Sequence, residues 1–224
     1  MNDYYRALEL YRWEKRKPTD APHAKIITES EQQPISQTDW DTLQTTVSRC
    51  TACSLHQTRT QTVFGVGNKN ADLMLIGEAP GFHEDQQGEP FVGRAGQLLT
   101  AMIKTIGFDR SQVYIANILK CRPPNNRDPL PEEVQSCTPF LNQQIALVKP
   151  RLLLAVGRIA AHYLLNTKSS LESLRNKIHR YGNDETPLIV TYHPAYLLRN
   201  PADKKKAFTD LQFTLRTLNE LTRE

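Results

Sequence analysis

The sequence lacks any apolar run long enough to cross a bilayer, and its start lacks the pattern of a secretory signal peptide. Cysteine is scarce as well, with 4 residues in a chain of 224. Both features argue against a membrane protein and for a cytoplasmic one whose thiols remain reduced. Disulfide bonds are therefore not the expected use of the cysteines.

A strong excess of one charge is also missing. Lys and Arg number 28 against 24 Asp and Glu, which gives a formal net charge of +4. Such mild basicity suits an anionic partner without requiring one. A chain of 224 residues is long enough for one domain with a full hydrophobic core, with or without an appendage.

The first 38 residues differ in composition from the rest of the chain. Residues 3–17 predict a short helix with the basic end RWEKRK, and Pro18 stops it. Residues 18–37 are rich in Pro, Thr, Ser and Gln, which is typical of a flexible linker. We therefore expect an N-terminal helix and linker in residues 1–38 and one folded domain in residues 39–224.

Short apolar runs alternate with helical patterns through the folded domain. The helical patterns begin near residues 93, 130 and 158, and a closing one covers residues 202–221. This alternation predicts an α/β fold in which helices cover both faces of a mostly parallel sheet. Its four expected strands lie at residues 73–76, 113–119, 152–156 and 188–191.

Polar residues stand where these expected strands end. Glu78 follows the first strand, Asn117 lies near the end of the second, and His193 follows the fourth. In a parallel sheet the carboxyl ends meet at one edge, where open α/β folds bind ligands. A carboxylate, an amide and an imidazole can surround one small ligand there. Taken singly, Asn117 is equally consistent with an ordinary turn residue. His193 alone is equally consistent with a histidine that caps a strand end and bonds to the backbone.

The loop after the first strand is the richest in chemical groups. Pro80 and Gly81 fix a turn that aims the peptide groups after Glu78 at the space above the sheet. A carboxylate there can act as a general base on water or stabilise a developing cation. The alternative is a solvated acidic loop. Its further acidic residues are Glu84, Asp85 and Glu89.

All the cysteines stand near the ends of expected elements. Cys50 and Cys53 form a CxxC pair, Cys121 follows the second strand, and Cys137 falls in an expected helix. By count, four thiolates fit a tetrahedral zinc site and a cubane iron–sulfur cluster equally well. A redox-active CxxC pair and four unrelated buried thiols are the alternatives.

Three sequence motifs carry a resemblance to a known family. Read with the CxxC pair upstream and Cys137 downstream, they closely resemble the family 4 uracil-DNA glycosylases, the iron–sulfur members of the uracil-DNA glycosylase superfamily. The resemblance extends from Cys50 to the C-terminus. The motifs are GEAPGFHEDQQGEPFVGRAG at residues 77–96, VYIANILKCRPP at 113–124 and YHPAYLLRNP at 192–201.

The resemblance implies a DNA repair enzyme that hydrolyses the N-glycosidic bond of uracil in DNA. The products are free uracil and an abasic site, which is the first step of base-excision repair. It also implies a three-layer α/β/α sandwich and a structural 4Fe-4S cluster on Cys50, Cys53, Cys121 and Cys137. The expected partner is uracil-containing DNA, single- or double-stranded, bound by a monomer without any membrane. The N-terminal segment is a candidate contact for other repair or replication proteins.

The same resemblance implies roles for individual residues. Glu78 orients the attacking water or stabilises the cationic sugar, and His193 stabilises the charge that builds on a uracil oxygen. Uracil itself is held by a stacking ring, an amide that reads its polar edge, backbone groups, and a side chain that walls off carbon C5. These are Phe91, Asn117, the Ala79 to Gly81 turn and Glu84, in that order.

Contact with DNA is expected from the segment after the HPAY turn. Leu197 or Leu198 is the candidate wedge that fills the gap left by the flipped base, and Arg199 would lie near a phosphate. The stretch between Cys121 and Cys137 is short and contains no His. It therefore lacks the reactive insertion of relatives that form covalent adducts, and we expect ordinary turnover.

Two other functions remain open from the residues alone. A metal-dependent nuclease would use Glu78, Glu84 and Asp85 as Mg²⁺ ligands, because that ion prefers hard oxygen ligands. A non-catalytic module would use the four cysteines to hold a metal and would only bind nucleic acid or protein.

Overall fold

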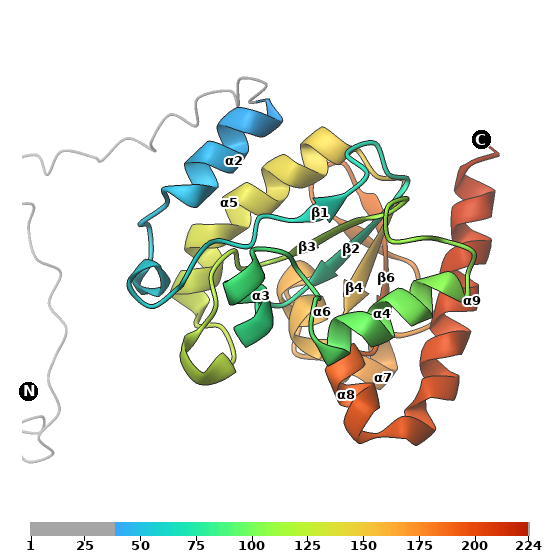
Figure 1. Cartoon of the computed structure of the whole chain (residues 1–224). Coiled ribbons are helices and arrows are strands. Elements are labelled where there is room, and N and C mark those ends of the chain that lie inside the picture. The colour runs from blue at the N-terminus through green and yellow to red at the C-terminus, as the bar shows by residue number, and fades with distance from the viewer. Residues whose placement is uncertain (1–38, 224) are drawn as a thin grey trace, which may run out of the picture. The chain divides into compact units, whose positions relative to one another are not determined.

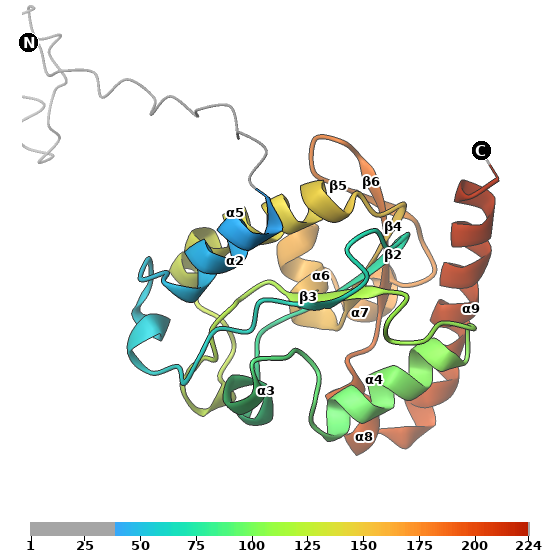
Figure 2. The same ribbon diagram turned by 45° about the horizontal axis from the view of Figure 1, so that its top comes forward.

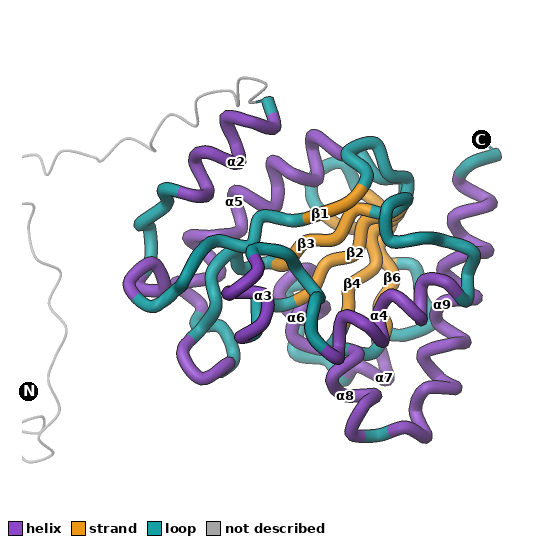
Figure 3. Tube along the Cα trace, viewed as in Figure 1, coloured by secondary structure: helices purple, strands orange, loops and turns teal. Residues whose placement is uncertain are grey.

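The computed structural model describes residues 39–223. The helix expected at residues 3–17 and the linker after it lie outside the described residues. Figure 3 marks the helices and strands along the chain. In chain order they are α2 (Trp40–Ser48), η1 (Ser54–Gln57), β1 (Val66–Gly67), β2 (Leu73–Gly77), α3 (Phe82–Gln87), α4 (Arg94–Lys104), β3 (Tyr114–Asn117), η2 (Pro124–Asn126), α5 (Pro131–Val148), β4 (Leu152–Val156), α6 (Arg158–Leu164), α7 (Leu171–Leu174), β5 (His179–Tyr181), β6 (Thr186–Thr191), α8 (Pro194–Arg199), η3 (Pro201–Asp203) and α9 (Lys204–Leu221).

One sheet runs through the centre in the order β1-β3-β2-β4-β6-β5. Strands β3, β2, β4 and β6 are parallel to one another, as the sequence predicts. The expected number of four strands is wrong, because two antiparallel edge strands bring the total to six. Strand β1 has only two residues and β5 is the partly exposed sequence HRY, so neither produces an apolar run.

Alternate residues of the central strands face opposite layers of helices. Met74 and Ile76 of β2 join a core that helices α2, α5 and α6 cover. Leu73 and Leu75 join a second core under α4, α8 and α9. Figures 1 and 2 show these two helical layers on opposite faces of the sheet. The predicted three-layer α/β/α sandwich is confirmed.

Local sequence signals fix where the helices begin. Asp39 caps α2, and its side chain accepts a hydrogen bond from the Thr42 N–H at 2.8 Å. Pro131 opens α5, and Glu133 accepts the Leu130 N–H at 2.8 Å. The long helices α5 and α9 both keep polar residues on their outer faces. Within residues 39–223, no helix combines the length and the apolar character that crossing a membrane requires.

Candidate active site

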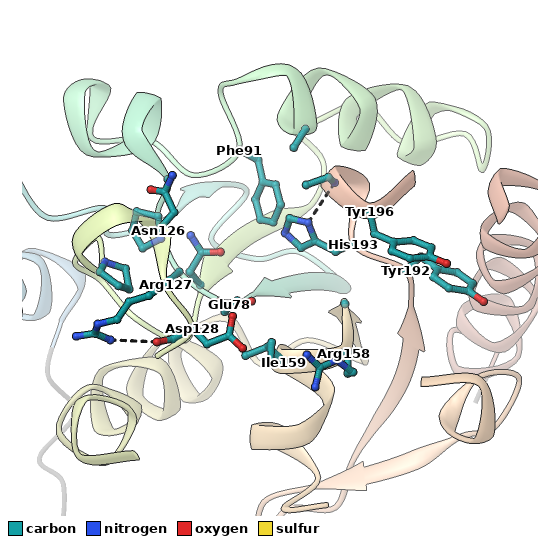
Figure 4. A pocket seen from close by; sticks show the side chains of 18 of the residues that line it. Glu78, Phe91, Asn126, Arg127, Asp128, Arg158, Ile159, Tyr192, His193 and Tyr196 are labelled. Atoms are coloured by element: carbon teal, nitrogen blue, oxygen red, sulfur yellow. Dashed lines mark hydrogen bonds between the residues drawn. The ribbon is translucent and has the colours of Figure 1, made fainter. Parts of the chain in front are cut away.

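The carboxyl ends of β2, β3, β4 and β6 open into one pocket of about 770 Å³ (Figure 4). The register places Gly77 of β2 beside Asn117 of β3, so the residues after these strands emerge together. Most of the residues singled out from the sequence line this pocket. They are Glu78, Ala79, Gly81, Glu84, Phe91, Asn117, His193 and Arg199.

Gly77 leaves room for both an aromatic ring and an amide in the pocket. A Cβ atom at Gly77 would lie 2.3 Å from Asn117 Oδ1 and 2.6 Å from Phe91 Cζ. Asn117 is buried, and within the described residues its Oδ1 has no hydrogen-bond partner. Its backbone oxygen accepts a hydrogen bond from the buried Lys120 ammonium at 2.7 Å, which fixes the residue. An unpaired buried acceptor beside a flat ring suits a planar ligand with a polar edge.

The backbone of Phe91 is held in an uncommon conformation. Its φ of 56° lies in the left-handed region, which is costly for a bulky residue. Two neighbours stabilise this loop: the Arg110 side chain donates to Pro90 O, and Glu84 Oε1 accepts the backbone N–H of the two residues after Phe91 at 3.0 and 3.2 Å. A side chain at Gly96 would collide with the Phe91 carbonyl. The ring is therefore placed before any ligand arrives.

Glu78 is the carboxylate at the base of the pocket. Its backbone oxygen accepts the Leu119 N–H at 3.0 Å, which joins the turn after β2 to the segment after β3. Burial and then the nearby Asp128 raise the pKa of Glu78 to about 7, although Arg158 acts in the opposite direction. A carboxylate with such a pKa is a stronger base than usual near neutral pH.

His193 faces the Phe91 ring, with the ring centroids 5.7 Å apart. Burial and the positive charge of Arg199 lower the pKa of His193 to about 4, against a smaller opposite effect of Glu84. The imidazole is therefore neutral at neutral pH. Its Nδ1 accepts the Ala195 N–H at 3.2 Å, so the proton is on Nε2. Gly157 has a φ of 103°, and a side chain there would lie 2.7 Å from His193 Cβ.

Sequence reasoning missed one wall of the pocket. Asn126, Arg127 and Asp128 come from the loop between β3 and α5, and Arg158 and Ile159 come from the start of α6. Both segments follow parallel strands, so the rule that selected Glu78 and His193 also applied to them. The polar loop carries no apolar run, and this is why none of its residues was predicted to line the pocket, although Arg127 was a candidate phosphate contact.

The DNA-contact prediction needs a correction at one residue. Leu197 is 1% exposed and packs in the core beneath α8, so it is not free to enter a DNA helix. Leu198 is exposed, and Arg199 lines the pocket. Of the two candidate wedges, the structure leaves only Leu198 at the surface.

The three carboxylates proposed for a nuclease do not converge. Asp85 is buried and faces away from the pocket, where both its oxygens accept the Thr60 N–H at 2.9 and 3.1 Å. Glu84 Oε1 already accepts hydrogen bonds from backbone N–H groups of the loop that carries Phe91. Across residues 39–223, no three His, Cys, Asp or Glu side chains are grouped to hold a single metal ion, so neither these carboxylates nor the cysteines form a mononuclear site.

The four cysteines are free thiols around a second, narrow cavity. Arg59 Nη1 donates to Cys121 Sγ at 3.1 Å, and the Lys120 N–H donates to Cys137 Sγ at 3.2 Å. Burial raises the pKa of the Cys137 thiol to about 11, so without a metal this thiol keeps its proton. Four sulfurs with N–H donors beside them form the donor set that iron–sulfur clusters use.

Comparison with known proteins gives consistent matches over most of the described residues. Residues 64–214 match the sequence profile of the Uracil DNA glycosylase superfamily. The type-4 uracil-DNA glycosylase of Archaeoglobus fulgidus is 43% identical over 173 residues, which cover 74% of this chain and 86% of the relative. The enzymes of the same name from Sulfurisphaera tokodaii and Thermotoga maritima are each 45% identical, over 71% and 70% of this chain and 76% and 82% of their own lengths. The chain belongs to the uracil DNA glycosylase superfamily and, within it, to the type-4 uracil-DNA glycosylases.

Proposed function

We propose that this protein is a DNA repair glycosylase that hydrolyses the bond between uracil and deoxyribose. The products are free uracil and an abasic site. The observation that carries this proposal is the unpaired, buried Oδ1 of Asn117 next to the ring of Phe91. Uracil offers the matching features, since it is flat and carries an N–H between two carbonyl oxygens.

Uracil reaches this pocket only if its nucleotide turns out of the base stack. We infer that the uracil ring stacks on Phe91 and that Asn117 Oδ1 accepts the N3–H. The amide group of the same side chain then donates to O4, so one residue reads both a donor and an acceptor. Backbone groups of residues 79–81 bind the remaining polar edge.

Breaking the glycosidic bond leaves positive charge on the sugar and negative charge on the base. His193 is a neutral donor through Nε2–H, and we assign it to the uracil oxygen O2, where the charge builds. Glu78 orients a water molecule toward carbon C1′ and accepts its proton. The sugar cation is stabilised by the same carboxylate.

DNA contacts other than those to the uracil itself are assigned to α8. Leu198 fills the gap that the flipped nucleotide leaves, and Arg199 contacts a phosphate. The enzyme acts as a monomer in the cytoplasm, on the DNA. Residues 1–38 form a separate segment that adds DNA affinity or contacts other repair proteins.

The four cysteines are proposed to hold a 4Fe-4S cluster. Cys50 and Cys53 come from the segment after α2, Cys121 follows β3, and Cys137 lies on α5, so a cluster would tie three parts of the chain together. When bound, it would supply structural stability and no electron transfer. A purified protein with broad visible absorption and bound iron and sulfide supports this proposal, and a colourless zinc protein contradicts it.

The decisive experiment measures free uracil released from a labelled uracil-containing oligonucleotide in the presence of EDTA. The wild-type protein is expected to release uracil, and the strand is expected to break only after alkali treatment. Glu78→Ala and Asn117→Ala are each expected to lose about 10²- to 10³-fold in rate, as when one transition-state contact is removed. Asn183→Ala, in the turn at the opposite edge of the sheet, is the control and should keep full activity.

Other outcomes would point to other functions. Direct strand cleavage that EDTA abolishes would support the metal-dependent nuclease. Binding without release of any base would support a non-catalytic module. Full activity of Asn117→Ala would remove the proposed role of the amide while leaving the reaction in place.

A further inference from the structure

A second carboxylate stands beside Glu78, and the mechanism above does not use it. Asp128 lies in the loop between β3 and α5, is exposed, and lines the same pocket. Figure 4 shows its side chain next to that of Glu78, with Arg158 farther along the same wall. The two carboxylates are close enough to interact electrostatically. A cationic sugar in the pocket would face both of them.

The loop around Asp128 is fixed by contacts that do not involve a ligand. Arg127 forms two hydrogen bonds with Glu133, at 2.9 and 2.6 Å, and a third with the backbone oxygen of Asp128 at 3.0 Å. The Tyr163 hydroxyl donates to the backbone oxygen of Pro129 at 3.1 Å. Glu133 is fully buried, so the loop is anchored to the start of α5. The carboxylate of Asp128 is thereby held at the pocket while its backbone carries the structural contacts.

We propose that Asp128 is a second catalytic carboxylate, which faces the reacting sugar while Glu78 accepts the proton of the attacking water. This inference rests on the proposed glycosylase function. In the reaction the bond from C1′ to uracil N1 breaks, and its electron pair leaves with the base. The water oxygen bonds to C1′, and one water proton passes to Glu78. That proton then leaves to solvent or to the uracil anion.

The environments of the two carboxylates divide the roles. Glu78 is half-buried, and this burial raises its pKa, whereas the side chain of Asp128 is exposed to solvent. The groups that face Glu78 are Asp128 from the loop and Arg158 and Tyr163 from α6. Asp128 raises the pKa of Glu78 and Arg158 lowers it. Removing either charge should therefore move the pH dependence in a known direction.

The test is the pH profile of single-turnover uracil release, measured with enzyme in excess. Asp128→Asn is expected to lower the maximal rate about 10- to 100-fold and to shift the acidic limb to lower pH. Arg158→Gln is expected to shift the same limb to higher pH. Asp128→Glu should recover most of the rate. Asp184→Asn removes a matching exposed charge in the turn before β6, away from the pocket, and should change neither quantity.

Substrate affinity gives an independent readout. Asp128 repels the DNA phosphates, so Asp128→Asn should bind uracil-containing DNA at least as tightly as the wild type while reacting more slowly. An unchanged rate and an unchanged limb in Asp128→Asn would overturn the proposal. A rate loss with an unmoved limb would also overturn it, because Asp128 would then act only through the loop. Absence of uracil release by the wild type would instead be a failure of the proposed function.

Discussion

Two clusters of polar side chains meet at the end of strand β6, and they differ in how completely their polar groups are paired. In the pocket, Asn117 Oδ1 has no partner within the described residues, and Glu78 is half-buried. In the second cluster, Arg175 binds both oxygens of Asp210 at 2.9 to 3.1 Å. Asp210 also accepts the Thr191 hydroxyl at 2.9 Å.

The Arg175 cluster is saturated with partners on every side. The same guanidinium donates to Glu172 at 2.9 Å and to the backbone oxygen of Lys206 at 3.0 Å, and it lies over the ring of Tyr192. The Tyr192 hydroxyl in turn donates to Glu172 at 2.7 Å. Buried polar groups that are fully paired hold a structure together, whereas unpaired ones are costly and mark the places where a ligand completes them.

The two clusters are joined through the end of β6. Thr191 belongs to the paired cluster, and His193, two residues later, belongs to the pocket. The saturated cluster therefore fixes the strand end from which the imidazole projects. We expect substitutions in the paired cluster to act on stability, and substitutions in the pocket to act on catalysis.

The largest expected effect is on the paired cluster. Arg175→Met leaves the buried Asp210 carboxylate without its partner, and we expect the free energy of unfolding to fall by about 3 to 5 kcal/mol. Chemical denaturation followed by circular dichroism measures this. The double variant Arg175→Met/Asp210→Leu should recover much of the loss, since no lone charge then remains. A loss below about 1 kcal/mol in the single variant would contradict the role of the pair.

In the pocket, replacing a half-buried charged residue is expected to raise the free energy of unfolding, not to lower it. The pKa of Glu78 is raised to about 7 by burial, so the folded protein binds the proton more tightly than the unfolded chain does. Stability from this group is present at low pH and is lost as the pH rises toward 7. Glu78→Gln should therefore raise the free energy of unfolding at pH 8 by about 2 kcal/mol, allowing for partial exposure, and change it little near pH 4. Denaturation at both pH values tests this, and a destabilised variant at pH 8 would contradict it.

Sequence patterns predicted most of the fold because the central strands are buried on both faces. Each of these strands forms a short apolar run, and the bounds of β4 match the expected residues 152–156. Strands β1 and β5 were missed because an edge strand of two or three partly exposed residues carries no such signal.

From the residues alone, the site was predictable only at or just after the end of a buried strand, and Phe91 and Glu84 were predicted from the family resemblance. Glu78 and His193 satisfy that rule, and both line the pocket. Asp128 lies eleven residues beyond Asn117 at the end of β3, and only the fixed loop brings it to Glu78. The choice between Leu197 and Leu198 depends on which side of α8 faces the core, and a helix of six residues does not settle that from sequence.

Glu84 belongs to both categories, because it lines the pocket and is also paired. Its Oε1 accepts the backbone N–H groups of Val92 and Gly93, so its main contact is with the loop of Phe91. Glu84→Gln keeps an acceptor oxygen and should lower the free energy of unfolding by less than about 1 kcal/mol. Glu84→Gln should slow uracil release a few-fold and release no thymine, because the wall beside C5 keeps its size.

Glu84→Ala leaves two N–H groups without an acceptor and should lower the free energy of unfolding by about 1 to 3 kcal/mol. Parallel assays on uracil- and thymine-containing oligonucleotides, with denaturation of both variants, separate the two roles. Thymine release by Glu84→Gln would mean that the charge excludes the methyl group, whereas an unchanged stability of Glu84→Ala would mean that the loop does not depend on Glu84.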